Sequence, residues 1–375
     1  MSGALVHEWL APRGGSENVF ESLTRIFPDA ARYCLWNDSG GRFTVDGETW
    51  LARTPLRGRK AAALPLMPLA WRSLPTVDAE WVLASSHLFA HHARFAGPAR
   101  GAPKLVYAHT PARYIWNPEL DARGGSLPVK AAAGTMKDLD RRRAQEAVAI
   151  AANSAFVQTR IARAWHREST VIHPPVDVAS FLRTPEPSAH DQDVLDRLPD
   201  TFLLGFSRFI PYKRLDLAVQ AGAAAGVPVV LAGAGPDEER LRAFAAEHAP
   251  GAVTFVRSPG PDLYRALLHR CLALVFPAVE DFGIVPVEAM AAGRPVIANA
   301  LGGTAETIVD GSTGVLVEDW SPEEMRRAVD TVTRASPEAC RAQSERFSEE
   351  VFADRIRAWV AESLASGDAT QARAV

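Results

Sequence analysis

The sequence has few cysteines and no spacing that would join them to a metal. Its three cysteines, Cys34, Cys271 and Cys340, are far apart and odd in number. Secreted disulfide frameworks use an even set of cysteines in a short chain, and zinc modules use ligand pairs at short spacing. We therefore expect buried free thiols in a reducing compartment, and neither a disulfide scaffold nor a zinc module.

Long apolar runs and an excess of positive charge are also absent. No segment approaches the ~20 apolar residues of a membrane span, and the N-terminal stretch lacks the charged leader of a secretory signal. A net charge of -3 gives no basic footprint for nucleic acid. These features predict a cytoplasmic protein without a nucleic-acid partner, either soluble or peripheral on the inner face of the membrane.

What is present is a globular composition in a chain long enough for two domains. The chain has 375 residues, of which 47% are hydrophobic and 23% charged, and single cores rarely grow beyond about 250–300 residues. Short apolar runs alternate with helical segments, which indicates an α/β protein with parallel sheets. The expected strands are 4–9, 80–85, 104–109, 149–154, 171–177, 202–206, 227–231, 253–256, 273–276 and 295–298.

The most informative stretch runs from Val275 to Val317. It has the order strand, loop, helix, strand, with the helix over 285–292, and so predicts a βαβ unit. Glu280 lies in the loop and Glu288 inside the helix. Both carboxylates are therefore expected at the carboxyl edge of the sheet, where open α/β sheets bind ligands.

The start of this helix also predicts an anion site. Phe282, Gly283 and Ile284 would present backbone N–H groups there, and the helix dipole adds to their attraction for a group such as pyrophosphate. Taken as a lone pair of glutamates, Glu280 and Glu288 would be no more than a helix cap and a solvated helix residue.

The letters of this stretch resemble a known family. E-D-F-G-I-V-P-V-E is similar to the motif of two glutamates separated by seven residues in the retaining glycosyltransferases of family 4, which have the GT-B fold. E-A-M-A-A-G-R-P-V-I-A and G-G-T-A-E-T follow in step. The resemblance implies that Glu280 lies beside the donor sugar and that Glu288 holds the nucleotide ribose.

A pair of cations precedes this block. Arg208 and Lys213 stand on either side of Pro211, in a loop that enters a helix. Cations are disfavoured at helix N-termini, so their presence favours a function over a plain surface pair. The family resemblance implies that they clamp the pyrophosphate, where fixed cations stabilise the charge of the leaving group. It also places Arg257, more loosely, near the nucleotide base.

The first half contributes two further candidates. Gly14 and Gly15 follow the first strand, with Ser16 as the expected N-cap, and the resemblance implies contact with donor phosphate or acceptor; a plain turn that needs a positive φ is the alternative. His109 ends a strand and is expected to face the ligand cleft rather than the core. In the resemblance it contacts the donor sugar, and H-T-P-A-R-Y is similar to bacterial mannosyltransferases that build polysaccharides on lipid carriers.

Several histidines and aspartates are of the residue types that bind metals, but their spacing does not match a metal site. Two histidines are expected at the surface, and two D-x-D pairs are expected on solvated segments. These residues are His91, His92, Asp138, Asp140, Asp191 and Asp193. We therefore expect no metal and no cofactor.

The stretch from Arg53 to Pro75 is basic, rich in proline and free of acidic residues. Its leucines, methionine and tryptophan look exposed, so it could lie on an anionic membrane or grip a lipid-linked acceptor. The alternative is a proline-broken loop and helix packed on the first domain.

The resemblance predicts that the chain has the GT-B fold, with two Rossmann-like domains. Residues 1–178 would bind the acceptor, with 350–375 packing back on them, and residues 179–349 would bind the nucleotide sugar. A long helix over Pro337 to Leu364 would cross back to the first domain, and the end from Ser366 would fray.

The function implied is retaining transfer of a hexosyl group, with mannose from GDP-mannose as the favoured donor, to an acceptor hydroxyl. The acceptor would be a glycan, a lipid-linked glycan or a small-molecule glycoside. The alternatives are a nucleotide-sugar epimerase of the same fold, a transferase that uses a UDP- or TDP-sugar on a small molecule, a sugar phosphorylase and a non-catalytic sugar-binding protein.

Overall fold

A computed structural model describes residues 2–116 and 127–372, with the backbone alone described for 127–133 and 367–372. The chain divides into two compact units. The first contains residues 1–175 and 352–375, and the second contains residues 176–351. The sequence analysis placed these divisions after residues 178 and 349, so the two sets of boundaries differ by a few residues.

The first unit is built on a seven-stranded parallel sheet. Its order is β3-β2-β1-β4-β5-β6-β7, which reverses direction between β1 and β4, so a ligand crevice is expected beyond the carboxyl ends of those two strands. The last strand is shorter than the expected 171–177, because two prolines follow and cannot donate to a ladder. The strands are β1 Gly3–His7, β2 Ala31–Cys34, β3 Gly47–Glu48, β4 Trp81–Ser86, β5 Lys104–Ala108, β6 Ala149–Ala152 and β7 Thr170–Val171.

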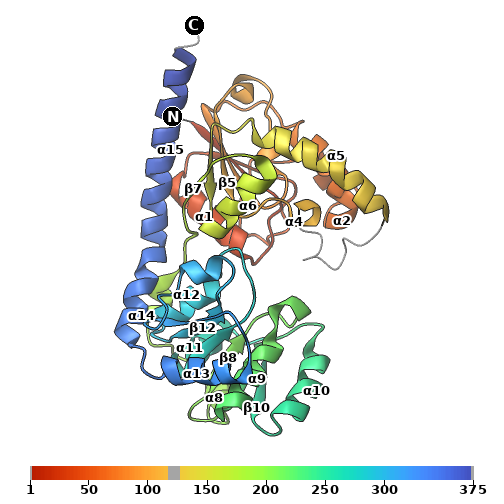
Figure 1. Cartoon of the computed structure of the whole chain (residues 1–375). Helices are drawn as coiled ribbons and strands as arrows, with labels where there is room; N and C mark the ends of the chain where they lie inside the picture. The colour runs from red at the N-terminus through yellow and green to blue at the C-terminus, as the bar shows by residue number, and fades with distance from the viewer. Residues whose placement is uncertain (1, 117–126, 373–375) are drawn as a thin grey trace. The chain divides into compact units, whose positions relative to one another are not determined.

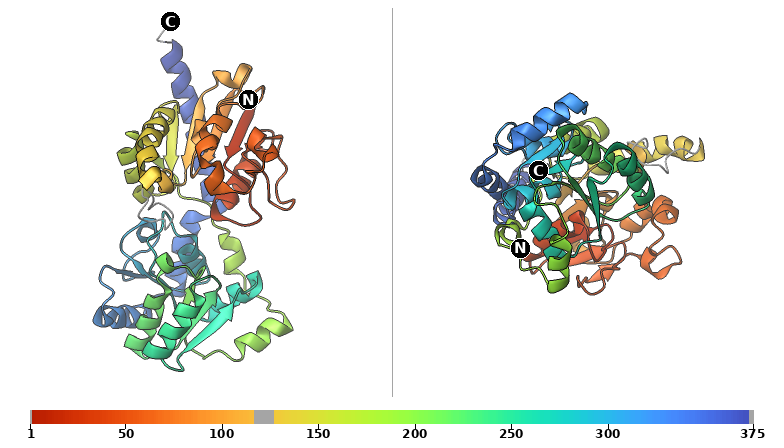
Figure 2. Two further views of the ribbon diagram at one scale, coloured as in Figure 1. Left: turned by 90° about the vertical axis from the view of Figure 1, so that its right-hand side faces the viewer. Right: turned by 90° about the horizontal axis from the view of Figure 1, so that it is seen from below.

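Helices cover both faces of this sheet (Figure 2). Apolar side chains of α1 share one core cluster with Phe352, Ile356 and Trp359 of the long helix α15, which lies along this unit in Figure 1. The helices are α1 Gly15–Ile26, α4 Arg113–Trp116, α5 Leu127–Ala144, α6 Ala155–Trp165 and α15 Glu349–Ala372, with short 3₁₀ turns η3 Ala90–His92 and η4 Pro98–Arg100.

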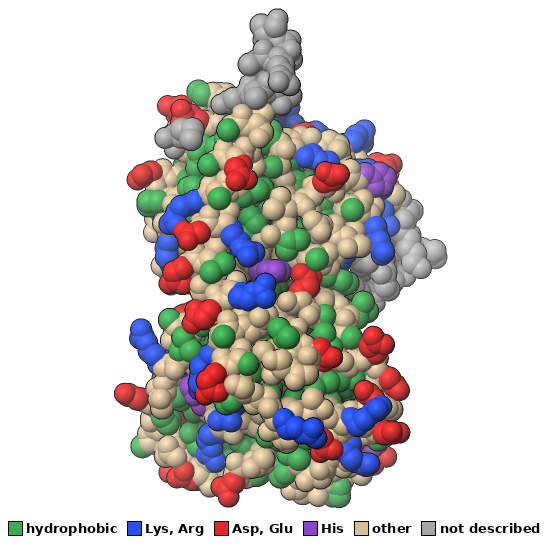
Figure 3. All heavy atoms as spheres, turned by 60° about the vertical axis from the view of Figure 1, so that its left-hand side comes forward, with side chains coloured by type: hydrophobic (Ala, Val, Ile, Leu, Met, Phe, Trp, Pro, Cys, Tyr) green, Lys and Arg blue, Asp and Glu red, His purple; other side chains and the backbone are tan. Residues whose placement is uncertain are grey.

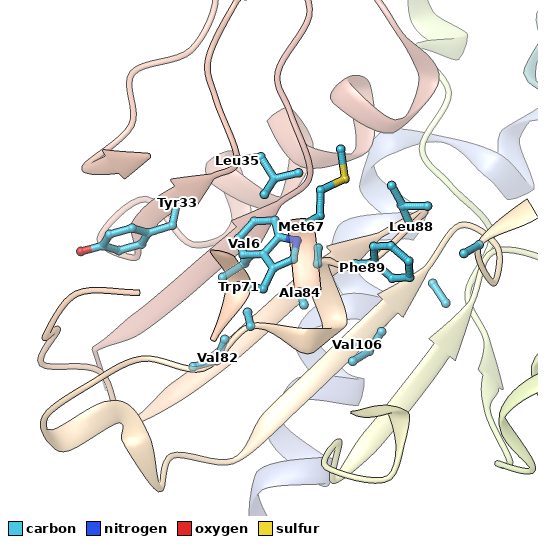
Figure 4. Packing of buried hydrophobic residues seen from close by; sticks show 14 of the residues in the cluster. Val6, Tyr33, Leu35, Met67, Trp71, Val82, Ala84, Leu88, Phe89 and Val106 are labelled. Carbon is cyan, nitrogen blue, oxygen red and sulfur yellow. The ribbon is translucent and has the colours of Figure 1, made fainter. Parts of the chain in front are cut away.

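The basic, proline-rich stretch forms short helical turns on the first unit. They are η1 Trp50–Arg53, α2 Lys60–Ala63, η2 Leu64–Leu66 and α3 Met67–Trp71. Met67 and Trp71 are fully buried and belong to the same cluster as Val6 and Leu35, as the close view shows (Figure 4). The expectation that these two residues are exposed was therefore wrong. Leu66 and Leu69 do face solvent, with 37% and 62% of their surface exposed.

The second unit has a six-stranded parallel sheet in the order β10-β9-β8-β11-β12-β13. The order reverses between β8 and β11, which pair directly. The strands are β8 Leu203–Phe206, β9 Val229–Gly233, β10 Val253–Arg257, β11 Ala273–Phe276, β12 Val296–Asn299 and β13 Gly314–Val317. Both sheets therefore have the strand order of a doubly wound nucleotide-binding fold.

The segment from Pro337 to Leu364 is not one helix. It forms α14 Pro337–Ser344, a 3₁₀ turn η8 Glu345–Phe347 and then α15, because Ser348 has extended backbone. The helix α15 continues to Ala372, so the end does not fray at Ser366; residues 373–375 lie outside the described part. The other elements of the second unit are α7 Val178–Leu182, α8 Ala189–Leu195, η6 Pro211–Lys213, α9 Leu215–Ala225, α10 Glu238–His248, α11 Pro261–Arg270, α12 Ile284–Ala291, η7 Gly303–Glu306 and α13 Pro322–Val332.

Two expectations from composition can be compared with this fold. Cys34, Cys271 and Cys340 are buried free thiols, as predicted. Among the described helices, none is both long and apolar enough to cross a membrane. On the face drawn in Figure 3, acidic and basic side chains are interspersed, which gives no extended basic surface there.

Candidate functional site

The candidate site of the second unit lies where its strand order reverses. Lys213 at the end of η6 follows β8, and Glu280 follows β11. The Lys213 Nζ lies 2.5 Å from the Glu280 Oε1, and the two side chains are only 13% and 16% exposed. A cation and a carboxylate are thus fixed beside each other at the edge where doubly wound sheets bind ligands.

Arg208 lies in the same loop as Lys213 but is exposed. Among the described residues, no acidic side chain forms an ion pair with it, so its charge is available to a ligand. The loop does not enter α9 directly, because η6 comes first and Arg214 then adopts a left-handed conformation with φ 50°. The predicted cations are therefore in the predicted loop, with one of them paired.

Close backbone packing shapes the start of α12. Gly283 precedes the helix with φ 92°, and a Cβ at this position would lie 2.4 Å from Thr304 Oγ1, so a larger residue would not fit. The N–H of Gly303 donates to the carbonyl of Glu280 over 2.8 Å. The first N–H groups of a helix have no partner within the helix, so a ligand at the start of α12 can accept from them.

Glu288 lies in the second turn of α12, in an apolar and aromatic environment. The Tyr264 Oη donates to its Oε2 over 2.6 Å, and the Tyr264 ring stacks on Phe206 with centroids 3.9 Å apart. Burial raises the pKa of Glu288 to about 7, although the hydrogen bond from Tyr264 opposes the rise. Tyr264 was not predicted from the sequence, where its sole signal was an aromatic residue on the helix that follows β10.

Arg257 lies at the rim of a separate small cavity in the second unit. Its side chain is 74% exposed and is 3.4 Å from a carboxylate oxygen of Glu238. The cavity has a volume of about 430 Å³ and is lined by Arg257, Ser258 and Gly260 on one side and by His190 of α8 on the other. Arg257 therefore lines a hollow, which fits the expectation of a base contact without testing it.

In the first unit, His109 follows β5 at the carboxyl edge of the sheet and is 9% exposed. That it faces the ligand cleft stays a prediction. Its Nε2 lies 2.8 Å from the Ser85 Oγ, which is also 3.1 Å from the His7 Nδ1. Burial lowers the pKa of His109 to about 3, so the ring is neutral at physiological pH. The contacts of His7 and Ser85 with this site were not predicted from the sequence.

The glycine loop after β1 differs from the turn and from the N-cap that were expected there. The Gly14 φ is 167°, which is extended backbone, and neither Gly14 nor Gly15 has a left-handed conformation. The alternative of a turn that needs a positive φ was therefore wrong. The carboxylate of Glu17 occupies the space over Gly14 and accepts from the Ala11 N–H over 3.2 Å. Gly14, rather than Ser16, is the N-cap of α1.

Three residues that the sequence analysis placed at the surface are buried. His91, His92 and Asp140 all have 0% exposure, and they form a cluster in the first unit. Asp138, on the same helix as Asp140, is 68% exposed, as expected. The alternating charges of this helix did not indicate that Asp140 is buried. Asp191 and Asp193 lie in or beside the first turn of α8 and belong to no potential metal cluster of the described residues.

The second unit is similar in sequence to known glycosyltransferases. Residues 189–350 match the family described as glycosyl transferases group 1. The chain is 29% identical over 271 residues to alpha-1,3/1,6-mannosyltransferase alg-2 of Neurospora crassa, covering 59% of this chain and 57% of that protein. It is also 29% identical over 301 residues to a D-inositol 3-phosphate glycosyltransferase of Stackebrandtia nassauensis, covering 73% of this chain and 65% of that protein. The chain thus spans less than two thirds of these relatives.

Solved structures resemble the whole chain at lower identity. Anabaena HepE in complex with UDP has a TM-score of 0.71 at 19% identity and covers 96% of this chain and 100% of its own. A sucrose-phosphate synthase from Thermosynechococcus elongatus has a TM-score of 0.70 at 18% identity, with 97% and 100% covered. The chain therefore has the GT-B fold, and its residues 189–350 are similar to the glycosyl transferases of group 1.

Proposed function

We propose that the protein is a retaining hexosyltransferase that moves a sugar from a nucleoside diphosphate to an acceptor hydroxyl. The observation that carries this proposal is the fixed pair of Lys213 and Glu280 beside the free Arg208, at the switch point of the second sheet. The leaving diphosphate gains negative charge as the glycosidic bond breaks. Cations that are already positioned there stabilise the transition state more than the ground state.

The remaining residues of the second unit have separate proposed roles. The backbone N–H groups from Phe282 to Ile284 would receive diphosphate oxygens at the start of α12. Glu280 would lie at the donor sugar and hold Lys213 in place. Glu288 would accept hydrogen bonds from the ribose hydroxyls, with Tyr264 fixing its carboxylate. Arg257 would lie near the base.

The first unit would supply the acceptor side and one contact to the sugar. A neutral His109, held by Ser85, can donate one hydrogen bond or accept one without bringing a charge to the sugar. Gly14 and Gly15 would touch donor phosphate or acceptor. The Glu17 carboxylate, which now lies over Gly14, would repel an anion there unless its side chain moves. No metal takes part in the proposed transfer, because the departing phosphate can itself accept the proton of the acceptor hydroxyl.

GDP-mannose is the proposed donor, since the H-T-P-A-R-Y segment of this chain resembles mannosyltransferases and one relative is named as a mannosyltransferase. A UDP-sugar transferred to a small molecule is the second candidate. It is favoured by the similarity to a D-inositol 3-phosphate glycosyltransferase and to a fold relative that holds UDP. The proposed setting is the cytoplasm, with a glycan, a lipid-linked glycan or a small glycoside as acceptor.

A thermal-shift panel of GDP, UDP, ADP, TDP and their sugars tests the proposal directly. A ligand that binds only the folded state adds about 2.7 kcal/mol of stability at a hundred times its Kd. We expect the largest shift from GDP and GDP-mannose. A dominant response to UDP ligands would replace the donor and leave a glycosyltransferase, whereas no response to any nucleotide would overturn the function. Release of free nucleotide and an epimerised sugar without acceptor would indicate the epimerase.

A further inference from the structure

A buried cluster in the first unit joins two histidines to one carboxylate. His91 and His92 lie on η3 and Asp140 lies on α5. The Nε2 atoms of His91 and His92 each lie 3.1 Å from the same Asp140 oxygen, Oδ1. All three side chains are at least 99% buried, and none of them lines either of the two described cavities.

Hydrogen bonds within the protein do not satisfy all the ring nitrogens of this cluster. His92 Nε2 has hydrogen-bond geometry toward Asp140 Oδ1. His91 Nε2 contacts the same oxygen at the same distance, but without good hydrogen-bond geometry. An unpaired buried ring nitrogen is costly. A metal ion placed among the three atoms would accept a lone pair from each of them and remove that cost.

The spacing fits a small divalent ion. Metal–ligand bonds of about 2.0–2.1 Å in a tetrahedron place neighbouring ligand atoms roughly 3.3 Å apart, and the two nitrogen–oxygen distances here are 3.1 Å. Imidazole nitrogens with one carboxylate oxygen are ligands that zinc accepts. With three ligands from the described residues, the fourth position of the tetrahedron is left to a water molecule.

The groups around Asp140 and His91 orient these two ligands as the second shell of a metal site does, whereas His92 Nδ1 has no hydrogen-bond partner among the described residues. The indole N–H groups of Trp116 and Trp165 both donate to Asp140 Oδ2 over 2.7 Å, which leaves Oδ1 as the atom presented to an ion. The His91 Nδ1 lies 3.0 Å from the Ser86 Oγ. If Nδ1 carries the proton and donates to Ser86, Nε2 carries the free lone pair.

A carboxylate ends this chain of hydrogen bonds. The hydroxyl of Ser86 donates to Glu8 Oε1 over 3.4 Å, and the same oxygen receives the N–H groups of Leu88 and Ala90. The chain His91, Ser86, Glu8 thus fixes one ring from behind, as carboxylates do for metal-binding histidines. From this geometry we propose that His91, His92 and Asp140 bind one zinc ion within the first unit.

The test measures metal on the full chain. The purified protein, incubated with zinc and then desalted, is expected to retain about one zinc per chain by elemental analysis, and its Tm is expected to rise with zinc concentration. His92→Gln should lose both effects. His248→Gln, the same change at an exposed histidine of α10, should lose neither. Equal zinc in wild type and His92→Gln, or less than about a tenth of an equivalent in wild type, overturns the proposal.

A second measurement covers the case in which His92→Gln does not fold. Titration of the wild-type protein with Co²⁺ is expected to give visible absorption bands of a four-coordinate ion that saturate at about one equivalent. Zinc should abolish these bands. A spectrum of hydrated Co²⁺ only, or stoichiometric iron in place of zinc, contradicts the assignment. None of these outcomes depends on nucleotide binding, so the zinc proposal and the proposed function fail separately.

Discussion

The ammonium group of Lys213 lies 2.5 Å from the carboxylate of Glu280, and the two side chains come from loops that follow the adjacent strands β8 and β11. Each charge neutralises the other before a ligand binds, whereas Arg208 remains exposed. A diphosphate would therefore meet one free cation and one that must be shared with a carboxylate. The pair also fixes the position of the Lys213 side chain. A long flexible side chain would otherwise lose conformational entropy when a ligand binds to it.

Removing either cation should slow transfer strongly. Lys213→Ala and Arg208→Ala are each expected to lower kcat by roughly a hundredfold to a thousandfold, the scale of losing one fixed group that stabilises developing charge. Steady-state kinetics at saturating donor provide the measurement. Arg327→Ala, which removes an exposed cation of α13, serves as the control and should retain full activity. More than half of wild-type turnover in either site variant contradicts the role.

The two glutamates should separate in kinetics. Glu288→Ala is expected to weaken the affinity for every nucleotide whatever sugar it carries, because the carboxylate is assigned to the ribose. Glu280→Ala is expected to lower turnover mainly, since it removes the partner of Lys213. Nucleotide Kd values and kcat measured for both variants distinguish the roles. The same kinetic profile in both variants would be inconsistent with this division.

Nucleotide affinity should depend on pH through Glu288. Its pKa is raised to about 7, so the carboxylate is largely protonated at pH 6 and largely ionised at pH 8. The ionised form accepts ribose hydroxyls better, and the affinity should rise across this range. Tyr264→Phe removes a donor that favours the ionised form, and so should move the midpoint to higher pH. A flat profile in the wild-type protein contradicts the assignment.

The raised pKa of Glu288 should also make the stability of the fold depend on pH. Stability should fall as pH rises, whereas nucleotide affinity should increase. The folded-state pKa of Glu288 lies above its ordinary value of 4.5, so the unfolded chain loses this proton more easily. The contribution of Glu288 to the free energy of unfolding should therefore fall as pH rises from about 4.5 through about 7. Glu288→Gln should remove that part of the pH dependence in thermal unfolding.

Turnover should not require magnesium or manganese. Asp138 is exposed, Asp140 is enclosed by histidines and indoles in the first unit, and Asp191 and Asp193 lie in or beside α8. Assays with and without added Mg²⁺ or Mn²⁺ should agree. Loss of activity in EDTA that magnesium or manganese restores would show that a metal takes part in transfer. Loss that zinc alone restores would instead concern the cluster of the first unit.

A membrane contact would use the exposed part of the basic stretch. Arg57 is held by Asp38 and Glu48, but Arg59 and Leu69 face solvent. Arg59→Ser with Leu69→Ser should reduce binding to anionic vesicles, because each cation near such a surface contributes about 1 kcal/mol. The control is Leu182→Ser with Arg327→Ser, which changes exposed residues of the second unit. Equal vesicle binding by wild type and the first variant, or none by either, favours plain packing on the first unit.

Local sequence patterns predicted ten of the thirteen described strands and missed β2, β3 and β13. Apolar runs between turn residues predicted strands such as β11 and β12, since a buried parallel strand needs a continuous apolar segment. The loops that carry Arg208, Lys213 and Glu280 follow β8 and β11, which were predicted in the same way. Where prolines or a single extended serine interrupted a pattern, as after β7 and at Ser348, the predicted element was too long.

Contacts between distant segments could not be predicted in this way. Asp140 sits on a helix with alternating charges, and nothing in that helix indicates that two indoles and two histidines from elsewhere surround its carboxylate. The same holds for Tyr264 and Glu288, which are 24 residues apart. Burial of polar groups depends on tertiary pairing, and single-sequence periodicity carries no information about the partner.

The division of the chain at residues 351 and 352, inside α15, bears on the order in which the protein matures on the ribosome. The second unit is complete once residue 351 has been synthesised, although it is encoded downstream of most of the first. The first unit then still lacks Phe352, Ile356 and Trp359, which belong to its core. Because domains generally fold as units during synthesis, the first unit should finish folding after the second.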